Sequence, residues 1–195
     1  MTRKLIKITA ILIAALSISV SLAYAFVYEQ QLQNVTQIIK DTKLWVDSFD
    51  STRDQWAENG SSPYLDVQDD PINYVYGEPN GAGSQDREQI GDFGFENHSQ
   101  TGTINSVILR IYGHGNPSRP NQNFFSVHLW DGTSWNEVMD FRGEANYIWK
   151  EVDVSAYLDT WDKVNGAKIY LEAEARGLNR AGQACDAAVL LVDYQ

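Results

Sequence analysis

The sequence feature that most constrains the fold is a two-residue alternation of apolar and polar side chains over residues 167–175. Ile169, Leu171 and Ala173 occupy alternate positions, and the positions between them carry tyrosine or charged side chains. Successive side chains of a β-strand point to opposite faces, so the pattern predicts a strand with one buried and one solvated face. Residues 106–113 behave similarly, and a second sheet is needed to cover such apolar faces.

Short strands of this kind account for most of the chain beyond residue 43. Turn-forming residues separate them, and one helical turn is expected over 155–161 with Ser155 as its N-cap. We therefore predict an all-β protein, an antiparallel two-sheet β-sandwich and specifically a jelly roll. The strands are expected at residues 44–49, 63–67, 73–76, 89–95, 106–113, 123–130, 135–141, 147–154, 167–175 and 186–194.

The amino-terminal segment is expected to enter a membrane. Residues 8–28 carry no charge, and a helix of 21 residues spans roughly 30 Å, the thickness of the bilayer hydrocarbon. The positive residues within 1–7 predict a cytoplasmic amino terminus and a body on the extracellular face of the cell membrane. An apolar helical stripe continues through residues 29–43, which are expected to form a stalk helix before an extracellular β-sandwich over 44–195.

The same segment also has the layout of a signal peptide. Basic residues precede the apolar run, and the small-x-small triplet 23–25 would permit cleavage after Ala25 and release of a secreted protein. A retained anchor is favoured because the apolar run is longer than the roughly 7–15 residues of a signal peptide. Asn-x-Ser/Thr triplets at Asn34, Asn59 and Asn97 fit an exported glycoprotein.

Charge restricts the partners of the exported body. The chain has 15 basic and 26 acidic residues, and three of the basic ones precede position 8, which leaves 12 against 26. Such a body repels nucleic acid and anionic lipid, so neutral glycans, other proteins or cations such as Ca²⁺ are the expected partners. Cys185 is the only cysteine, so it is expected to be a small buried residue rather than an intermolecular crosslink.

Several stretches give the body a family resemblance. They are residues 62–66 (SPYLD), 73–74 (NY), 90–95 (IGDFGF) and 103–109 (TINSVIL), with 130–135 (WDGTSW) in support. Together they resemble jelly-roll domains of archaeal and bacterial secreted or membrane-anchored surface proteins, which are broadly similar to carbohydrate-binding modules. The resemblance implies a sandwich of the galactose-binding or concanavalin-like kind at the cell surface. It carries over no catalytic or binding residue.

Aromatic side chains around one predicted hairpin are the candidate ligand-binding residues. If the chain turns over residues 131–134, Trp130 faces Trp135, and His128 faces Glu137 on the same side of the sheet. Exposed aromatic rings can stack on the C–H groups of a sugar, and the alternative is that they stabilise the hairpin by cross-strand packing. The candidate glycan-binding residues are Trp130, Trp135, His128, and Tyr147 with Trp149, which also share a face.

A metal site is the next candidate. Asp66, Asp69 and Asp70 fall together in a predicted turn, and loop carboxylates can supply several of the six to eight oxygens that Ca²⁺ requires. Their spacing lacks the regularity of an EF-hand loop. The alternative is a solvated acidic surface, and the only cofactor the sequence suggests is Ca²⁺.

Catalytic motifs are missing from the sequence, so we do not expect an enzyme. Glu172 and Glu174 form the one pair that resembles a glycosidase dyad, because positions two apart on a strand share a face with Cα atoms about 6.5 Å apart. The favoured interpretation is that both carboxylates point into water beside Lys168 and Arg176, where opposite charges balance.

Three functions remain open at this stage. The first is an extracellular, membrane-tethered binding module, glycan-binding or adhesive, which an exposed coplanar pair of aromatic rings would favour. The second is a structural subunit of a surface layer or filament that self-assembles through its amino-terminal segment or a strand edge, for which the apolar stretch 189–192 is a candidate. The third is a glycoside hydrolase.

Overall fold

The computed structural model describes residues 40–50, 53, 57–59, 74–77, 86–99, 101–175 and 182–195. The expected membrane segment at 8–28, the stalk residues 29–39 and the strand at 63–67 lie outside these residues. The described residues belong to one compact unit, Lys40–Gln195. Within them, no helix has the length and apolar character that crossing a bilayer requires.

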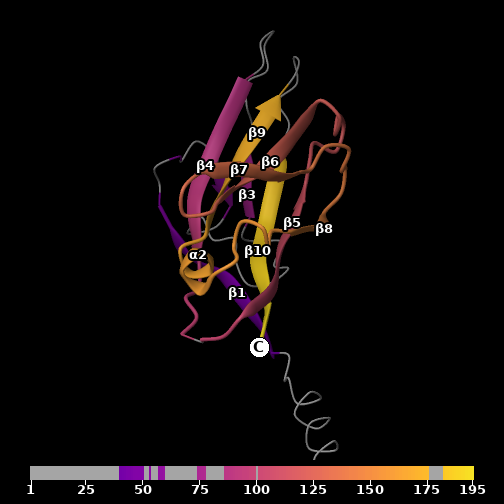
Figure 1. The fold of residues 1–195 in the computed structure, drawn as a ribbon. Coiled ribbons are helices and arrows are strands. Elements are labelled where there is room, and N and C mark those ends of the chain that lie inside the picture. The colour runs from indigo at the N-terminus through magenta and orange to yellow at the C-terminus, as the bar shows by residue number, and fades with distance from the viewer. Residues whose placement is uncertain are drawn as a thin grey trace, which may run out of the picture. The chain divides into compact units, whose positions relative to one another are not determined.

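Ten strands and one short helix make up the described part of this unit, and every strand pairing is antiparallel (Figure 1). The predicted strands after residue 73 are present, with small shifts at their ends. The elements are β1 (Lys40–Phe49), β2 (Ala57–Asn59), β3 (Tyr74–Gly77), β4 (Asp86–Phe95), β5 (Ile104–His114), β6 (Asn123–Trp130), β7 (Trp135–Asp140), β8 (Ile148–Asp153), α2 (Trp161–Asn165), β9 (Lys168–Ala175) and β10 (Gln183–Tyr194).

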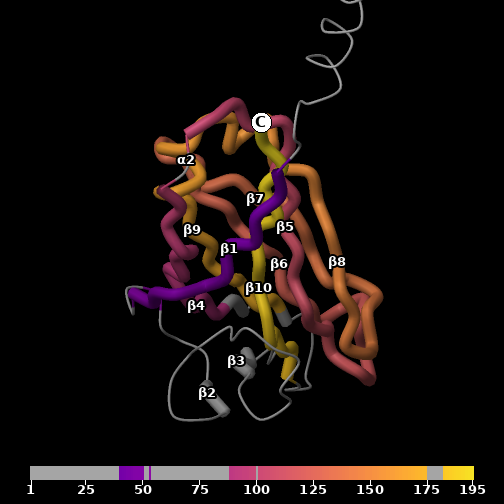
Figure 2. The backbone as a smooth tube through the Cα atoms, turned by 90° about the horizontal axis from the view of Figure 1, so that it is seen from below, coloured from indigo at the N-terminus to yellow at the C-terminus, as the bar shows by residue number. Residues whose placement is uncertain are grey.

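Strand β1 connects two sheets. Its residues 40–45 pair with β10, and residues 46–49 pair with β4, with a shift in register between Val46 and Ser48. Figure 2 shows β1 crossing between the two groups of strands. In the first, the β10 sheet, β10 has β5 and then β8 on one side and β1, β3 and β2 on the other. In the second, the β9 sheet, the order is β1–β4–β9–β6–β7. The predicted all-β, antiparallel fold class is confirmed.

The core lies between the inner faces of the two sheets. Ile169, Leu171 and Ala173 of β9 are completely buried, as the alternation predicts. Burial of each large apolar side chain in this way stabilises the fold by about 1.5–3 kcal/mol. This gain offsets part of the conformational entropy that the chain loses on folding. The facing strands β5, β6 and β10 contribute Val107, Leu109, Ile111, Phe125, Val127, Leu129, Ala188 and Leu190 to the same cluster.

Two expected boundaries were wrong. Residues 40–43 are not part of a stalk helix, because β1 begins at Lys40 and pairs there with the end of β10. The helix also begins later than expected, with Thr160 rather than Ser155 as the N-cap of α2. The Ser155 hydroxyl instead accepts a hydrogen bond from the backbone N–H of Val107, which ties the loop to β5.

The carboxyl-terminal strand is central, not peripheral. Because β10 has neighbours on both sides, the apolar stretch 189–192 is not available as a free sheet edge, contrary to expectation. Cys185 in the same strand is completely buried, as predicted, and burial raises the pKa of its thiol well above the usual value. A neutral, enclosed thiol is a poor nucleophile.

Candidate functional site

The outer surface of β4, β9, β6 and β7, here called the β9 face, gathers most of the candidate side chains. Register places Lys168, Trp130 and Trp135 side by side in one row across β9, β6 and β7. The next row contains Tyr170, His128 and Glu137. The predicted pairing of Trp130 with Trp135 and of His128 with Glu137 is therefore confirmed.

The two tryptophans line a pocket at the end of the hairpin. Their ring centroids are 5.4 Å apart, and their planes are inclined by 49°. The pocket, here called the hairpin pocket, has a volume of about 250 Å³ and is lined by Asp92, Trp130, Trp135 and Lys168. Because the rings form a V, they do not provide the coplanar pair that a flat stacking surface would need.

Arg53, which sequence reasoning missed, lies over the second row of the β9 face. Its guanidinium carbon is 4.3 Å from the ring centroid of Tyr170 and 5.2 Å from that of Trp135. Its Nε atom is 3.1 Å from the Asp92 carboxylate, and Nη1 donates to the side-chain oxygen of Gln89 at 3.1 Å. Arg53 therefore neutralises Asp92 and packs on two aromatic rings at once. A single arginine gives no periodic signal in the sequence.

His128 lies in the second row and is not among the residues that line the hairpin pocket. Its ring stacks on Tyr170 with a centroid distance of 4.4 Å and an interplanar angle of 2°. Since Arg53 also packs against Tyr170, this tyrosine is held between neighbours and only 8% exposed. The structure thus gives His128 a supporting position beside the pocket.

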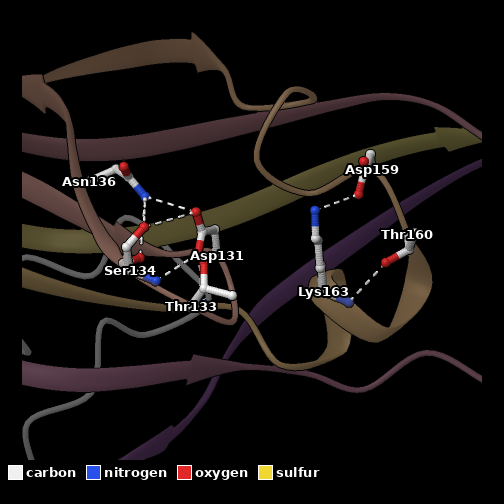
Figure 3. A network of polar contacts seen from close by, with 7 residues as sticks. All are labelled: Asp131, Thr133, Ser134, Asn136, Asp159, Thr160 and Lys163. Carbon is white, nitrogen blue, oxygen red and sulfur yellow. Dashed lines mark hydrogen bonds and ion pairs between the residues drawn. The ribbon is translucent and has the colours of Figure 1, made fainter.

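The turn between the two tryptophans is held by one carboxylate. Asp131 accepts hydrogen bonds from the backbone N–H groups of Thr133 and Ser134, from both hydroxyls of these residues, and from the side-chain amide of Asn136 (Figure 3). The donors stabilise the charged form, with the N–H of Ser134 having the largest effect, and hold the pKa of Asp131 far below its usual range. Asp131 therefore sets the geometry of the hairpin that carries Trp130 and Trp135.

Replacing Asp131 by asparagine is expected to loosen this turn in a pH-dependent way. Because the folded-state pKa is lowered, the charge stabilises the fold above the unfolded pKa near 4, and this contribution is lost as the pH falls further. The thermal midpoint of Asp131→Asn should thus lie below that of the wild type near neutral pH, with the gap closing in acid. Hydrogen exchange at the Thr133 and Ser134 amides should be several-fold faster.

Asp159→Asn is the matched control for that experiment. Asp159 is also an exposed aspartate with a lowered pKa, but its main partner is Lys163 at 2.8 Å, at the start of α2 (Figure 3). Exchange at the hairpin amides should not change in this variant. Equal exchange rates in Asp131→Asn and the wild type would show that the turn does not depend on the carboxylate.

Tyr147 and Trp149 do not join the hairpin pocket. Trp149 pairs with Tyr112 on the outer face of the β10 sheet. The ring of Tyr112 lies 5.2 Å from Tyr147 on one side and 5.2 Å from Trp149 on the other, and Arg110 lies 4.8 Å from the Trp149 ring centroid. The three rings pack against one another across the strands, and each stays partly exposed.

The carboxylates of Glu172 and Glu174 do not point into water. Each residue is only 8% exposed, so the expectation that they are solvated beside Lys168 and Arg176 was wrong. The Gln89 side-chain amide donates to Glu172, and the same side chain accepts from Arg53. A hydrogen-bonded chain therefore runs from Arg53 through Gln89 to Glu172, beside the row that contains Tyr170. The alternation along the strand places both side chains on the outer face of the sheet. It could not reveal their burial, because burial depends on what covers that face.

The proposed calcium ligands Asp66, Asp69 and Asp70 lie outside the described residues. Among the residues that are described, no group of three or more His, Cys, Asp or Glu side chains is placed to hold a metal ion. A calcium site thus remains an expectation from the sequence.

No family model and no curated protein matches the sequence. Solved structures with a similar fold include a family 29 carbohydrate-binding module, with a TM-score of 0.41, 9% identity, and coverage of 78% of this chain and 92% of that one. A xylan-binding module, CBM15, gives a TM-score of 0.39, 10% identity, and coverage of 78% and 97%. The K1 adhesin domain of Lys-gingipain from Porphyromonas gingivalis gives 0.38, 9%, and coverage of 77% and 97%.

Carbohydrate-binding modules are thus among the structures to which this chain is similar, and the similarity is loose. About one aligned residue in ten is identical in each case. All three TM-scores lie below 0.5, and the similarity identifies no binding residue.

Proposed function

We propose that this protein is a non-catalytic, membrane-tethered binding module on the extracellular face of the cell, and that it takes a glycan in the hairpin pocket. The observation that carries the proposal is the composition of that pocket. Two tryptophan rings flank it, and a carboxylate (Asp92) and an ammonium group (Lys168) lie beside them. A sugar needs these two kinds of partner, apolar surface for its C–H groups and polar atoms for its hydroxyls.

The inclination of the rings supports a pocket for one sugar residue. Two faces at 49° cannot both lie against a flat crystalline surface, but they can contact two sides of a single ring. The turn secured by Asp131 and the packing of Arg53 on Trp135 hold the rings in place before a ligand arrives. Such preorganisation lowers the entropy cost of binding.

The location rests on the amino-terminal segment. Residues 8–28 are uncharged and long enough to span a bilayer, and the acidic body follows them. A tethered module would hold a glycan close to the cell surface, which is an adhesive role.

Two edge strands of the described sheets, β8 and β7, have features that oppose assembly by strand addition, and this favours a binding module. Lys150 lies on the inward side of the edge strand β8, where its ammonium group donates to the backbone oxygen of Asp140 at 2.8 Å and pairs with Glu144 at 3.3 Å. A second edge strand, β7, has a shift in register where it pairs with β6. Inward charges and irregular edge strands oppose the addition of further strands.

The proposal is tested by glycan-array binding followed by titration calorimetry on the full chain in a detergent without sugar groups. Trp135→Ala and Trp130→Ala are each expected to weaken binding of the array hit about 30-fold, the loss of a central aromatic anchor. Trp149→Ala is the matched control, since this tryptophan lies on the other sheet, and its affinity should equal that of the wild type. A blank array, or an equal loss in all three variants, would overturn the proposal.

A further inference from the structure

The hairpin pocket contains one positive charge, that of Lys168, for which the described residues provide no ion-pair partner. Of its two charged residues, Asp92 is already paired with Arg53 at 3.1 Å. Within the described part of the chain, Lys168 makes no ion pair. It is exposed and directly opposite Trp130 in the register of β9 and β6. Lys168 therefore places an ammonium group next to an aromatic ring, and no described acidic side chain forms an ion pair with it.

We propose that the hairpin pocket takes an acidic sugar, a uronate residue, with its ring against Trp130 and its carboxylate at Lys168. The inference rests on the proposed glycan-binding function and specifies its ligand. Side chains directly opposite on antiparallel strands have Cβ atoms about 5 Å apart. A ring that stacks on the indole therefore brings its own carboxylate within reach of the lysine side chain. Asp92, with its charge balanced by Arg53, is left to accept hydrogen bonds from sugar hydroxyls.

The charge of the whole protein limits the ligand further. The net charge is −11, Glu137 lies in the row next to Lys168 on the β9 face, and Glu172 lies one row further along β9. A polyanion would be repelled by this field, whereas a single carboxylate seated at Lys168 would not. The ligand that fits is a neutral glycan with an isolated uronate residue.

The test uses pairs of oligosaccharides that differ by one charge. The probes are neutral xylo- and gluco-oligosaccharides that bear one glucuronate or galacturonate, each compared with its methyl ester, which keeps the ring but removes the charge. The full chain is expected to bind at least one acid about fivefold more tightly than its ester, the affinity that an exposed ion pair adds. This ratio should fall towards one in 0.5 M salt, since salt screens the pair.

Substitutions at Lys168 should change the ratio of acid binding to ester binding. Lys168→Met is expected to bring the acid-to-ester ratio to about one, because it weakens binding of the acid more than binding of the ester, and Lys168→Glu is expected to reverse the ratio. Lys43→Met is the control, an exposed lysine on the outer side of the β10 sheet, and should keep the wild-type ratio. Because both lysines are exposed, the variants should fold normally, which a thermal midpoint would confirm.

The outcomes separate the two proposals. If every acid and its ester bind equally and both depend on Trp135, the protein binds glycans but the uronate assignment is wrong. Tighter binding of the esters would overturn the assignment as well. If neither form binds and the glycan array is also blank, the proposed function fails and the uronate assignment fails with it.

Discussion

Replacing Gly91 by alanine is expected to lower the free energy of unfolding by about 3 kcal/mol and to weaken binding at the hairpin pocket. Gly91 has a φ angle of +114°, a backbone conformation that residues with a side chain rarely adopt. A Cβ atom there would lie 2.9 Å from the backbone oxygen of Ile169 and 3.1 Å from the Cα atom of Tyr170. Both neighbours belong to the backbone of β9 and cannot move aside cheaply.

The position matters for binding because Gly91 forms part of a β-bulge. The register of β4 with β9 shifts between Ile90 and Phe93, so the intervening residues have no regular partners. This bulge positions Asp92, whose backbone exchanges two hydrogen bonds with Asp50 and whose carboxylate pairs with Arg53. Alanine would force the bulge to rearrange, and Asp92 would move relative to the pocket.

Gly143→Ala is the matched control for Gly91→Ala. Gly143 also has a positive φ, +86°, but the nearest atom to an added Cβ is a side-chain oxygen at 3.6 Å, an ordinary contact. Alanine at position 143 therefore adds only backbone strain, which should lower the free energy of unfolding by about 1 kcal/mol. Urea unfolding of both variants and calorimetry with the array hit provide the measurement. Equal destabilisation of the two variants would contradict the role assigned to the bulge.

Replacing Phe125 by alanine is expected to lower the free energy of unfolding by about 3–5 kcal/mol. Phe125 is completely buried on the inner face of β6 and stacks on Phe141 with a centroid distance of 4.3 Å. The ring also fills the space beside Gly113, where a Cβ atom would lie 2.8 Å from its tip. Alanine would leave a cavity between two sheets whose backbones are held by hydrogen bonds, so the space cannot close.

The effect is large enough to read from a thermal scan. For a body of this size, 1 kcal/mol shifts the midpoint by about 2–4 °C, so Phe125→Ala should unfold roughly 10 °C below the wild type. Phe49→Ala provides the comparison, because Phe49 is only partly buried against the core and its ring centroid is 5.0 Å from that of Phe93. The free energy of unfolding should decrease clearly less in Phe49→Ala than in Phe125→Ala. A loss below 1 kcal/mol for Phe125→Ala would show that the core relaxes around the gap.

The sequence predicted the elements that depend on local pattern. The alternation around Ile169 and Leu171 correctly identified a strand and its buried face. The turn residues 131–134 predicted the hairpin and the pairing of Trp130 with Trp135. Both succeed because side-chain direction in a strand alternates with every residue, whatever the strand pairs with.

Other features depended on which strands meet. Tyr147 and Trp149 share a face as expected, but β8 belongs to the β10 sheet, so their rings pack on Tyr112 and not at the hairpin. The alternation along a strand shows which residues share a face, but it does not show to which sheet the strand belongs. For the same reason, the alternation that places Glu172 on the outer face of β9 did not reveal that this residue is buried.

By itself, the sequence determined the all-β class, most of the strands, the tryptophan hairpin and the acidic character of the body. Those properties follow from composition and from a two-residue period that acts over short distances. Only the tertiary structure decided that Arg53 lies over Tyr170 and neutralises Asp92, and therefore that Lys168 carries the unpaired charge of the pocket. These contacts join residues 39 to 117 positions apart, and no local pattern encodes them, because they arise only when β9 pairs with both β4 and β6.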